Sequence, residues 1–345
     1  MLRLLQYIFG SGKDQRKYRK PWIREAIERT VEGTDPWLRA VTGYKRKLRP
    51  AVIRSLDHID ALVGSLAPPI EAHFNPNGSS PSLAAFFAST AEMLDTFRND
   101  QTLHAYLRNQ ARSSGQVVAL LMMEKNERTI FGAELSGDVV VRDVPQLVVN
   151  FLSHRIQEPS ENEEETRYRL KRKAFDHLIG IARRCVSRMK SKRKDLERRR
   201  TLLHSKLSLM QRGEHGFTDR DSDDFPTRME LEEQLMKLDE ELREVGGEDR
   251  MLETYLNIVI DILANPEEHI WETKQCLILD LQGIKRTHLA GEEDCEITLH
   301  EFFTSEGRRW VLSLIALPVD DLQRVIKGSP RPQELQHTAL GSSLP

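Results

Sequence analysis

The chain has 345 residues, 39 % of them hydrophobic and 30 % charged, and its formal net charge is -2 at pH 7. This length allows a sizeable core in two domains, or in one domain with a large insertion. The small net charge disfavours a globally basic nucleic-acid-binding protein. Three cysteines without a CxxC spacing indicate a reducing compartment, so we expect a cytoplasmic protein.

Residues 1–34 form a predicted basic, amphipathic N-terminal segment. Residues 1–9 are too short to span a bilayer and precede basic residues without a small-residue cleavage site, so we reject a transmembrane helix and a secretory signal. We favour a segment that docks its leucines on the core. The alternative is peripheral contact of residues 1–24 with an anionic membrane surface.

Helical signals dominate residues 35–113, which we predict to form a helical bundle. Asp35 is a predicted N-cap because Pro36 follows it at the first helical position, and Pro50 is predicted to begin another helix. Phenylalanines and leucines at helical spacing then continue to Leu107.

Residues 114–156 and 267–327 carry strand patterns. The first part contains the predicted strands 117–122, 129–135 and 138–141, with turns at Lys125-Asn126 and Ser136-Gly137, and then a short predicted helix over 145–155. The second part contains the predicted strands 276–281, 295–303 and 309–317 and a closing helix over 319–326. Either set alone would be marginal, so we expect one small split mixed β-sheet. Residues 328–345 are a predicted disordered tail.

Residues 164–266 predict a long inserted antiparallel coiled-coil hairpin. Its second arm has leucines and valines at alternating spacings of four and three. Its first arm has one apolar row through Met189, Leu196 and Leu203 and a companion row through Cys185, Lys192 and Arg199 that turns basic. Folding back places the basic block 188–200 opposite the acidic block 230–248, with Asp249 near Lys190 or Arg193. The alternative is parallel pairing with a second chain.

The predicted interaction residues are the apolar seam and the charge blocks of this hairpin. They are Leu196, Leu203, Leu231, Leu235, Leu238, Leu242, Lys192, Arg193, Arg199 and Asp249.

Candidate chemical motifs are weak. Gly10-Ser11-Gly12-Lys13 lacks the remaining residues of a phosphate-binding loop. Asp219, Asp221, Asp223 and Glu230 have the spacing of a calcium-binding loop, but Asp224 replaces the glycine that the loop requires, and Thr227 to Glu230 is a capping box. Cys295 and His300 would point to opposite faces of a strand, which is poor metal geometry. We therefore predict no catalytic residue, cofactor or metal site.

The sequence predicts an α+β, predominantly helical protein with an N-terminal bundle, a split sheet and a projecting hairpin. We expect a non-enzymatic interaction or scaffold protein that presents the hairpin to a protein partner, with self-association as one form of that partnership. Nucleic acid is not an expected partner, because the basic block lacks interleaved aromatic residues and faces an acidic helix. The alternatives are the peripheral membrane protein and an enzyme or ligand sensor with a pocket on the split sheet.

Overall fold

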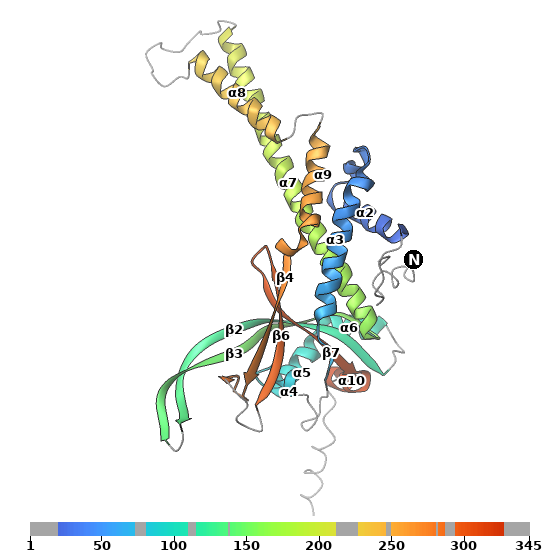
Figure 1. The fold of residues 1–345 in the computed structure, drawn as a ribbon, viewed down its shortest axis with the longest axis vertical. Helices are drawn as coiled ribbons and strands as arrows, with labels where there is room; N and C mark the ends of the chain where they lie inside the picture. The colour runs from blue at the N-terminus through green and yellow to red at the C-terminus, as the bar shows by residue number, and fades with distance from the viewer. Residues whose placement is uncertain are drawn as a thin grey trace, which may run out of the picture. The chain divides into compact units, whose positions relative to one another are not determined.

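The computed structural model describes residues 20–72, 81–109, 115–136, 139–211, 227–245, 250–280, 282–286 and 294–327. It contains helices and a β-sheet, so the chain is an α+β protein (Figure 1). Its contacts define two compact units. Unit 1 contains the described residues of 60–172 and 267–327, and unit 2 contains those of 20–59 and 173–266. The residues predicted to form one bundle, 35–113, are thus divided between the two units.

One sheet organises unit 1. Within the described residues its strands are β1 (Ile70–Glu71), β2 (Gln116–Ser136), β3 (Val139–Ser160), β4 (Ile270–Leu279), β5 (Lys285–Arg286), β6 (Cys295–Thr304) and β7 (Arg309–Pro318). The order is β3-β2-β7-β6-β4-β5, and β1 pairs in parallel with β7 while the other pairs are antiparallel. Near β5, Ile284 forms a bridge to Val148 of β3, so the two ends of the sheet meet at this point.

Two predictions for residues 114–156 are wrong. The expected strands 117–122 and 129–135 form one strand, β2, and Lys125-Asn126 lies inside it because both residues pair with β3. The helix expected over 145–155 is also part of β3. Pro145 suits the start of a helix, but a proline is equally tolerated in a strand at the end of a sheet.

Three β-bulges bend the ribbon formed by β2 and β3. The pairing register shifts at three places, and at each place β3 has one residue more than β2. Asp143, Ser153 and Glu158 lie at these shifts with positive φ angles of 60°, 57° and 49°. Bulges of this kind increase the bend and twist of a strand, and the ribbon is strongly curved (Figure 1).

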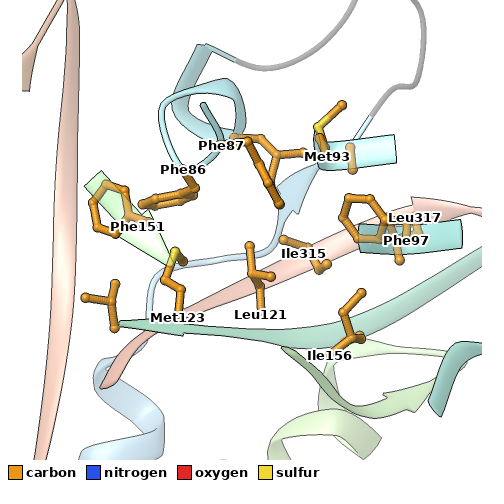
Figure 2. Close-up of a cluster of buried hydrophobic side chains, with 14 of the residues drawn as sticks. Phe86, Phe87, Met93, Phe97, Leu121, Met123, Phe151, Ile156, Ile315 and Leu317 are labelled. Carbon is orange, nitrogen blue, oxygen red and sulfur yellow. The ribbon is translucent and has the colours of Figure 1, made fainter. Parts of the chain in front are cut away.

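The core of unit 1 lies between the sheet and short helices. These helices are α4 (Pro81–Ala84), α5 (Thr90–Asn99), α6 (Gln101–Asn109) and α10 (Val319–Lys327). Leu121 and Met123 are fully buried, two residues apart on the same face of β2. They face the aromatic residues Phe86, Phe87 and Phe97 in the buried cluster (Figure 2).

Unit 2 is helical. Its described elements are α2 (Lys20–Thr34), the 3-10 helix η1 (Pro36–Ala40), the first part of α3 (Tyr44–Ser65), most of α7 (Glu163–Gln211), α8 (Arg228–Glu244), α9 (Met251–Ala264) and the first residue of η3 (Pro266–Glu268). Asp35 caps η1 by accepting a hydrogen bond from the Trp37 backbone N–H at 3.1 Å, as predicted. Pro50 lies inside α3 and does not begin it. Ser55 Oγ donates to the Leu263 carbonyl at 2.6 Å and joins α3 to α9.

Several predictions concern residues outside the described ranges. These are residues 1–19 of the N-terminal segment, the tip of the hairpin with its aspartates, the Gly246-Gly247 bend, Asp249 and the tail 328–345. In the described part of the N-terminal segment, Trp22, Ile23 and Ile27 are buried.

Candidate functional site

The candidate site consists of residues 186–211 of α7 together with α8, which we call the α7–α8 arm. α8 begins with the predicted capping box, in which Thr227 and Glu230 exchange side chain to backbone hydrogen bonds. α8 runs beside the C-terminal part of α7 (Figure 1). The Arg200 guanidinium and the Asp239 carboxylate form an ion pair between the two helices at 2.8 Å.

The apolar residues predicted for the seam are withdrawn from solvent. Leu196 and Leu231 are buried, and Leu203, Leu235, Leu238 and Leu242 are half-buried. Within residues 186–211 of α7 the buried and half-buried positions are Val186, Met189, Arg193, Leu196, Leu203, Leu207 and Met210. Their spacings follow a 3-4 heptad pattern in which Arg200 takes the position before Leu203.

The companion row predicted for α7 is wrong. Lys192 and Arg199 are exposed, and the row that faces inward contains Val186, Arg193 and Leu207, each one residue further along the chain. Arg193 is buried and its guanidinium pairs with Glu197 at 2.7 Å. The predicted row and the inward-facing row both repeat every seven residues. Only the inward-facing row is apolar at both ends, at Val186 and Leu207, and this difference could have identified it from the sequence.

Lys192 and Arg199 instead lie on one flank of the arm, seven residues apart. Lys206 continues this row one heptad later. All three side chains are exposed, and none makes an ion pair within the described part of the chain. The acidic helix therefore leaves this basic row largely unpaired, which differs from the predicted mutual neutralisation of the two charge blocks.

A groove follows the same flank. It has a volume of about 470 Å³. The α7 side contributes Arg198, Arg199 and Leu202 and the α8 side Gln234, Lys237 and Glu241, with Leu196, Leu203 and Leu238 from the seam. Leu202 is 55 % exposed, and Leu209, one heptad further, is 53 % exposed. Exposed leucines at a heptad spacing outside the seam give α7 a second apolar row.

The predicted contact of Asp249 with Lys190 or Arg193 cannot be placed, because Asp249 lies outside the described residues. Lys190 Nζ instead forms an ion pair with Asp35 at 2.6 Å and lies over the ring of Tyr255, 5.6 Å from its centroid. Burial raises the pKa of the Tyr255 hydroxyl. These contacts hold η1 and α9 against α7 within unit 2.

Two of the buried polar clusters in the described part of unit 1 contain a charged side chain beside other polar groups, and each has a structural explanation. Ser65 Oγ donates to Glu272, whose other carboxylate oxygen lies 2.5 Å from His300 Nδ1. The serine hydroxyl contacts the carboxylate and not the imidazole, so the three side chains do not form the directly bonded serine–histidine pair of a hydrolase triad. In the second cluster, Lys125 Nζ contacts Glu301, the Gln275 side-chain oxygen and Glu127.

Among the described residues, no three His, Cys, Asp or Glu side chains are grouped closely enough to hold a metal ion. Cys295 packs against the core cluster, whereas His300 pairs with Glu272, in agreement with their predicted opposite faces. None of the described helices combines the length and apolarity needed to cross a membrane.

Comparison with known proteins gave no relative: no family model, curated protein or solved structure matches this chain.

Proposed function

We propose that this chain is a non-enzymatic interaction protein whose α7–α8 arm is an antiparallel coiled-coil hairpin, and that the arm docks on the same arm of a second copy. The observation that carries the proposal is the flank described above. It combines a groove, an unpaired basic row on α7, acidic residues on α8 and exposed leucines. Two-helix arms with an apolar flank complete their packing as three- or four-helix bundles.

Charge favours a second copy as the occupant. A two-fold axis parallel to the arm places α7 of one copy opposite α8 of the other, so a surface that is basic on α7 and acidic on α8 is self-complementary. On α8, Glu241 and Glu244 are exposed and make no ion pair within the described residues, whereas Lys237, the base on the α8 side of the groove, is paired with Glu233 at 2.8 Å. In the dimer, the basic side chains on α7 of one copy therefore lie opposite the acidic side chains on α8 of the other copy.

The register follows from the ion pair within one arm. Arg200 and Asp239 lie at the same level, because their charged atoms are 2.8 Å apart. A two-fold axis parallel to the arm leaves each level unchanged, so Arg199 comes level with Glu240 and Glu241 of the second copy. Glu241 lines the groove beside Arg199, which makes this pair the most specific contact expected across the interface.

The expected affinity is modest. Burying a leucine fully contributes about 1.5–3 kcal/mol, and Leu202 and Leu209 are already partly covered. Exposed ion pairs add about 0.2–1 kcal/mol each, against the cost of association. We therefore expect a dissociation constant on the order of 10 µM.

Charge exchange between two variants tests the proposal. Arg199→Glu places like charges opposite Glu241 of the second copy, and Glu241→Arg places them opposite Arg199. Each variant alone is expected to lose at least tenfold in dimer affinity. An equimolar mixture is expected to form a heterodimer, because one of its two contacts is inverted and the other is native. Native mass spectrometry of the full-length chains, with one isotopically labelled, distinguishes the three species.

Lys194→Glu is the matched control, because Lys194 is an exposed base of α7 that makes no ion pair with any described residue and does not line the groove. This variant is expected to keep the wild-type dimer affinity. A wild-type chain that is monomeric at 200 µM, a mixture without heterodimer, or an equal loss in the control would each overturn the proposed self-docking.

A further inference from the structure

A second candidate site lies in unit 1, and its lining includes no residue of the arm. It is a cleft of about 400 Å³. Its lining comes from the segment 84–92, from β2 and β3, from the turn after β4 and from the first residue of β6. Binding clefts for small molecules are typically apolar concavities with a few convergent polar groups, and the lining fits this description.

The floor of the cleft is aromatic and fixed. Phe86 and Phe151 meet edge to face, with ring centroids 5.1 Å apart and an interplanar angle of 87°. Phe87 stacks on His154 at 4.4 Å, and the His154 ring nitrogen Nε2 hydrogen-bonds the Phe86 carbonyl at 2.7 Å. Burial lowers the pKa of His154, which keeps the ring neutral at pH 7. Leu279 completes the apolar lining.

Another part of the lining is the turn after β4, which is also held firmly. Asp280 Oδ1 accepts hydrogen bonds from the backbone N–H groups of Gln282 and Ile284, both at 2.9 Å. Its other oxygen pairs with Arg286 at 2.7 Å. The Gly283 carbonyl accepts from the Val149 N–H at 2.8 Å, which fastens the turn to β3. The cleft is thus preformed, with little ordering cost on binding.

Three polar side chains in the lining have no protein partner within the described residues, Arg128 of β2, Asn150 of β3 and Gln282 of the turn after β4. The other charged groups are engaged. Asp280 holds the turn, and Glu92 accepts a hydrogen bond from the Ala88 N–H at 2.9 Å near the start of α5. The free groups are therefore one planar cation and two amides, beside aromatic rings.

We infer that this cleft binds a small aromatic monocarboxylate. The flat ring of the ligand lies against the apolar floor, and its carboxylate accepts paired hydrogen bonds from the Arg128 guanidinium, with the Asn150 amide as a further donor. A guanidinium matches the two oxygens of a carboxylate in geometry and charge. The fixed carboxylate of Glu92 repels an anion, so the ligand carboxylate points towards Arg128.

Calorimetric titration of the full-length protein with two isosteric probes tests this assignment. 2-Naphthoate carries the carboxylate, and 2-naphthamide has the same ring without the charge. We expect 2-naphthoate to bind at least tenfold more tightly than the amide, because a charge-assisted contact is stronger than a neutral one. Arg128→Gln is expected to weaken 2-naphthoate at least tenfold and to change the affinity for 2-naphthamide less than twofold.

Two further variants complete the test. Arg142→Gln removes an exposed arginine from the same ribbon outside the cleft and is expected to leave both affinities unchanged. Ala88→Trp places a large ring at an exposed residue of the lining and is expected to abolish binding of both probes. The inference is overturned if wild-type protein gives no heat with 2-naphthoate at millimolar concentration, or if Arg128→Gln weakens both probes equally. Arg199→Glu is expected to bind both probes normally, which separates this site from the arm.

Discussion

Gly283 and Gly307 make a matched pair that tests the closure of the sheet. Both have positive φ angles, 74° and 78°, so alanine costs about 1–2 kcal/mol at either position through backbone conformation alone. The surroundings differ. A Cβ atom at Gly283 would lie 2.7 Å from the Val149 backbone oxygen, whereas at Gly307 no atom lies within 4 Å.

Gly283→Ala must therefore displace the turn from β3. The Val149 N–H loses its 2.8 Å hydrogen bond to the Gly283 carbonyl, and Val149 is only 2 % exposed. A buried donor left without an acceptor costs about 1–3 kcal/mol, so we expect Gly283→Ala to destabilise the protein by about 2–5 kcal/mol and Gly307→Ala by about 1–2 kcal/mol. Urea unfolding followed by circular dichroism measures the difference.

Hydrogen exchange gives the local readout. Peptides that contain Val149 are expected to exchange faster in Gly283→Ala and at the wild-type rate in Gly307→Ala. Equal destabilisation by the two variants, or an unchanged exchange rate at Val149, would refute the account of a sheet whose ends meet at this turn.

Three other predictions follow from the backbone and the titrating groups. Ser153→Val places a β-branched residue at a φ of 57°, and we expect it to lower the free energy of unfolding in urea by about 1–2 kcal/mol. The control is Leu152→Val at an exposed neighbour without a positive φ, which is expected to change that free energy by less than about 0.5 kcal/mol. Hydrogen bonds from Lys45 and Tyr44 lower the pKa of Glu28 to about 2, so its contribution is present above its ordinary value of 4.5 and is lost as the pH falls towards 2. A carboxyl NMR titration of Glu28 with a midpoint near 4.5 would contradict this. Burial lowers the pKa of His154, so stability is expected to fall as the pH drops below about 6.5. His154→Gln is expected to reduce the change in melting temperature between about pH 7 and 5.5 relative to the wild-type protein.

Local patterns were the part of the fold that could be predicted. The capping box at Thr227 and the leucines of α8 depend on residues three to seven positions apart, and these spacings can be read directly from the chain. Asp35 was also identifiable, because an N-cap acts on the residues that immediately follow it.

The curved ribbon could not be predicted in the same way. Its bulges occur at Asp143, Ser153 and Glu158, and none of these positions has the glycine that usually marks a positive φ. Lys125-Asn126 has the composition of a turn, but pairing with a strand about 25 residues away decides its conformation. Long-range pairing overrode local preference at both places.

The cleft was equally hidden from sequence reasoning. Phe86, Arg128, Asn150 and Asp280 are far apart in the chain and share no spacing or motif, so only the sheet brings them together. On α7, the two candidate heptad rows differ by one residue, and burial of Arg193 in place of Lys192 was not evident from composition.

The measurement that tests the central claim most directly is the mass of the full-length wild-type chain in solution as a function of concentration. Sedimentation equilibrium between about 1 and about 200 µM is expected to show a weight-average mass that rises from one chain towards two, consistent with association on the order of 10 µM. A mass of one chain at every concentration would contradict the proposed docking of one α7–α8 arm on another.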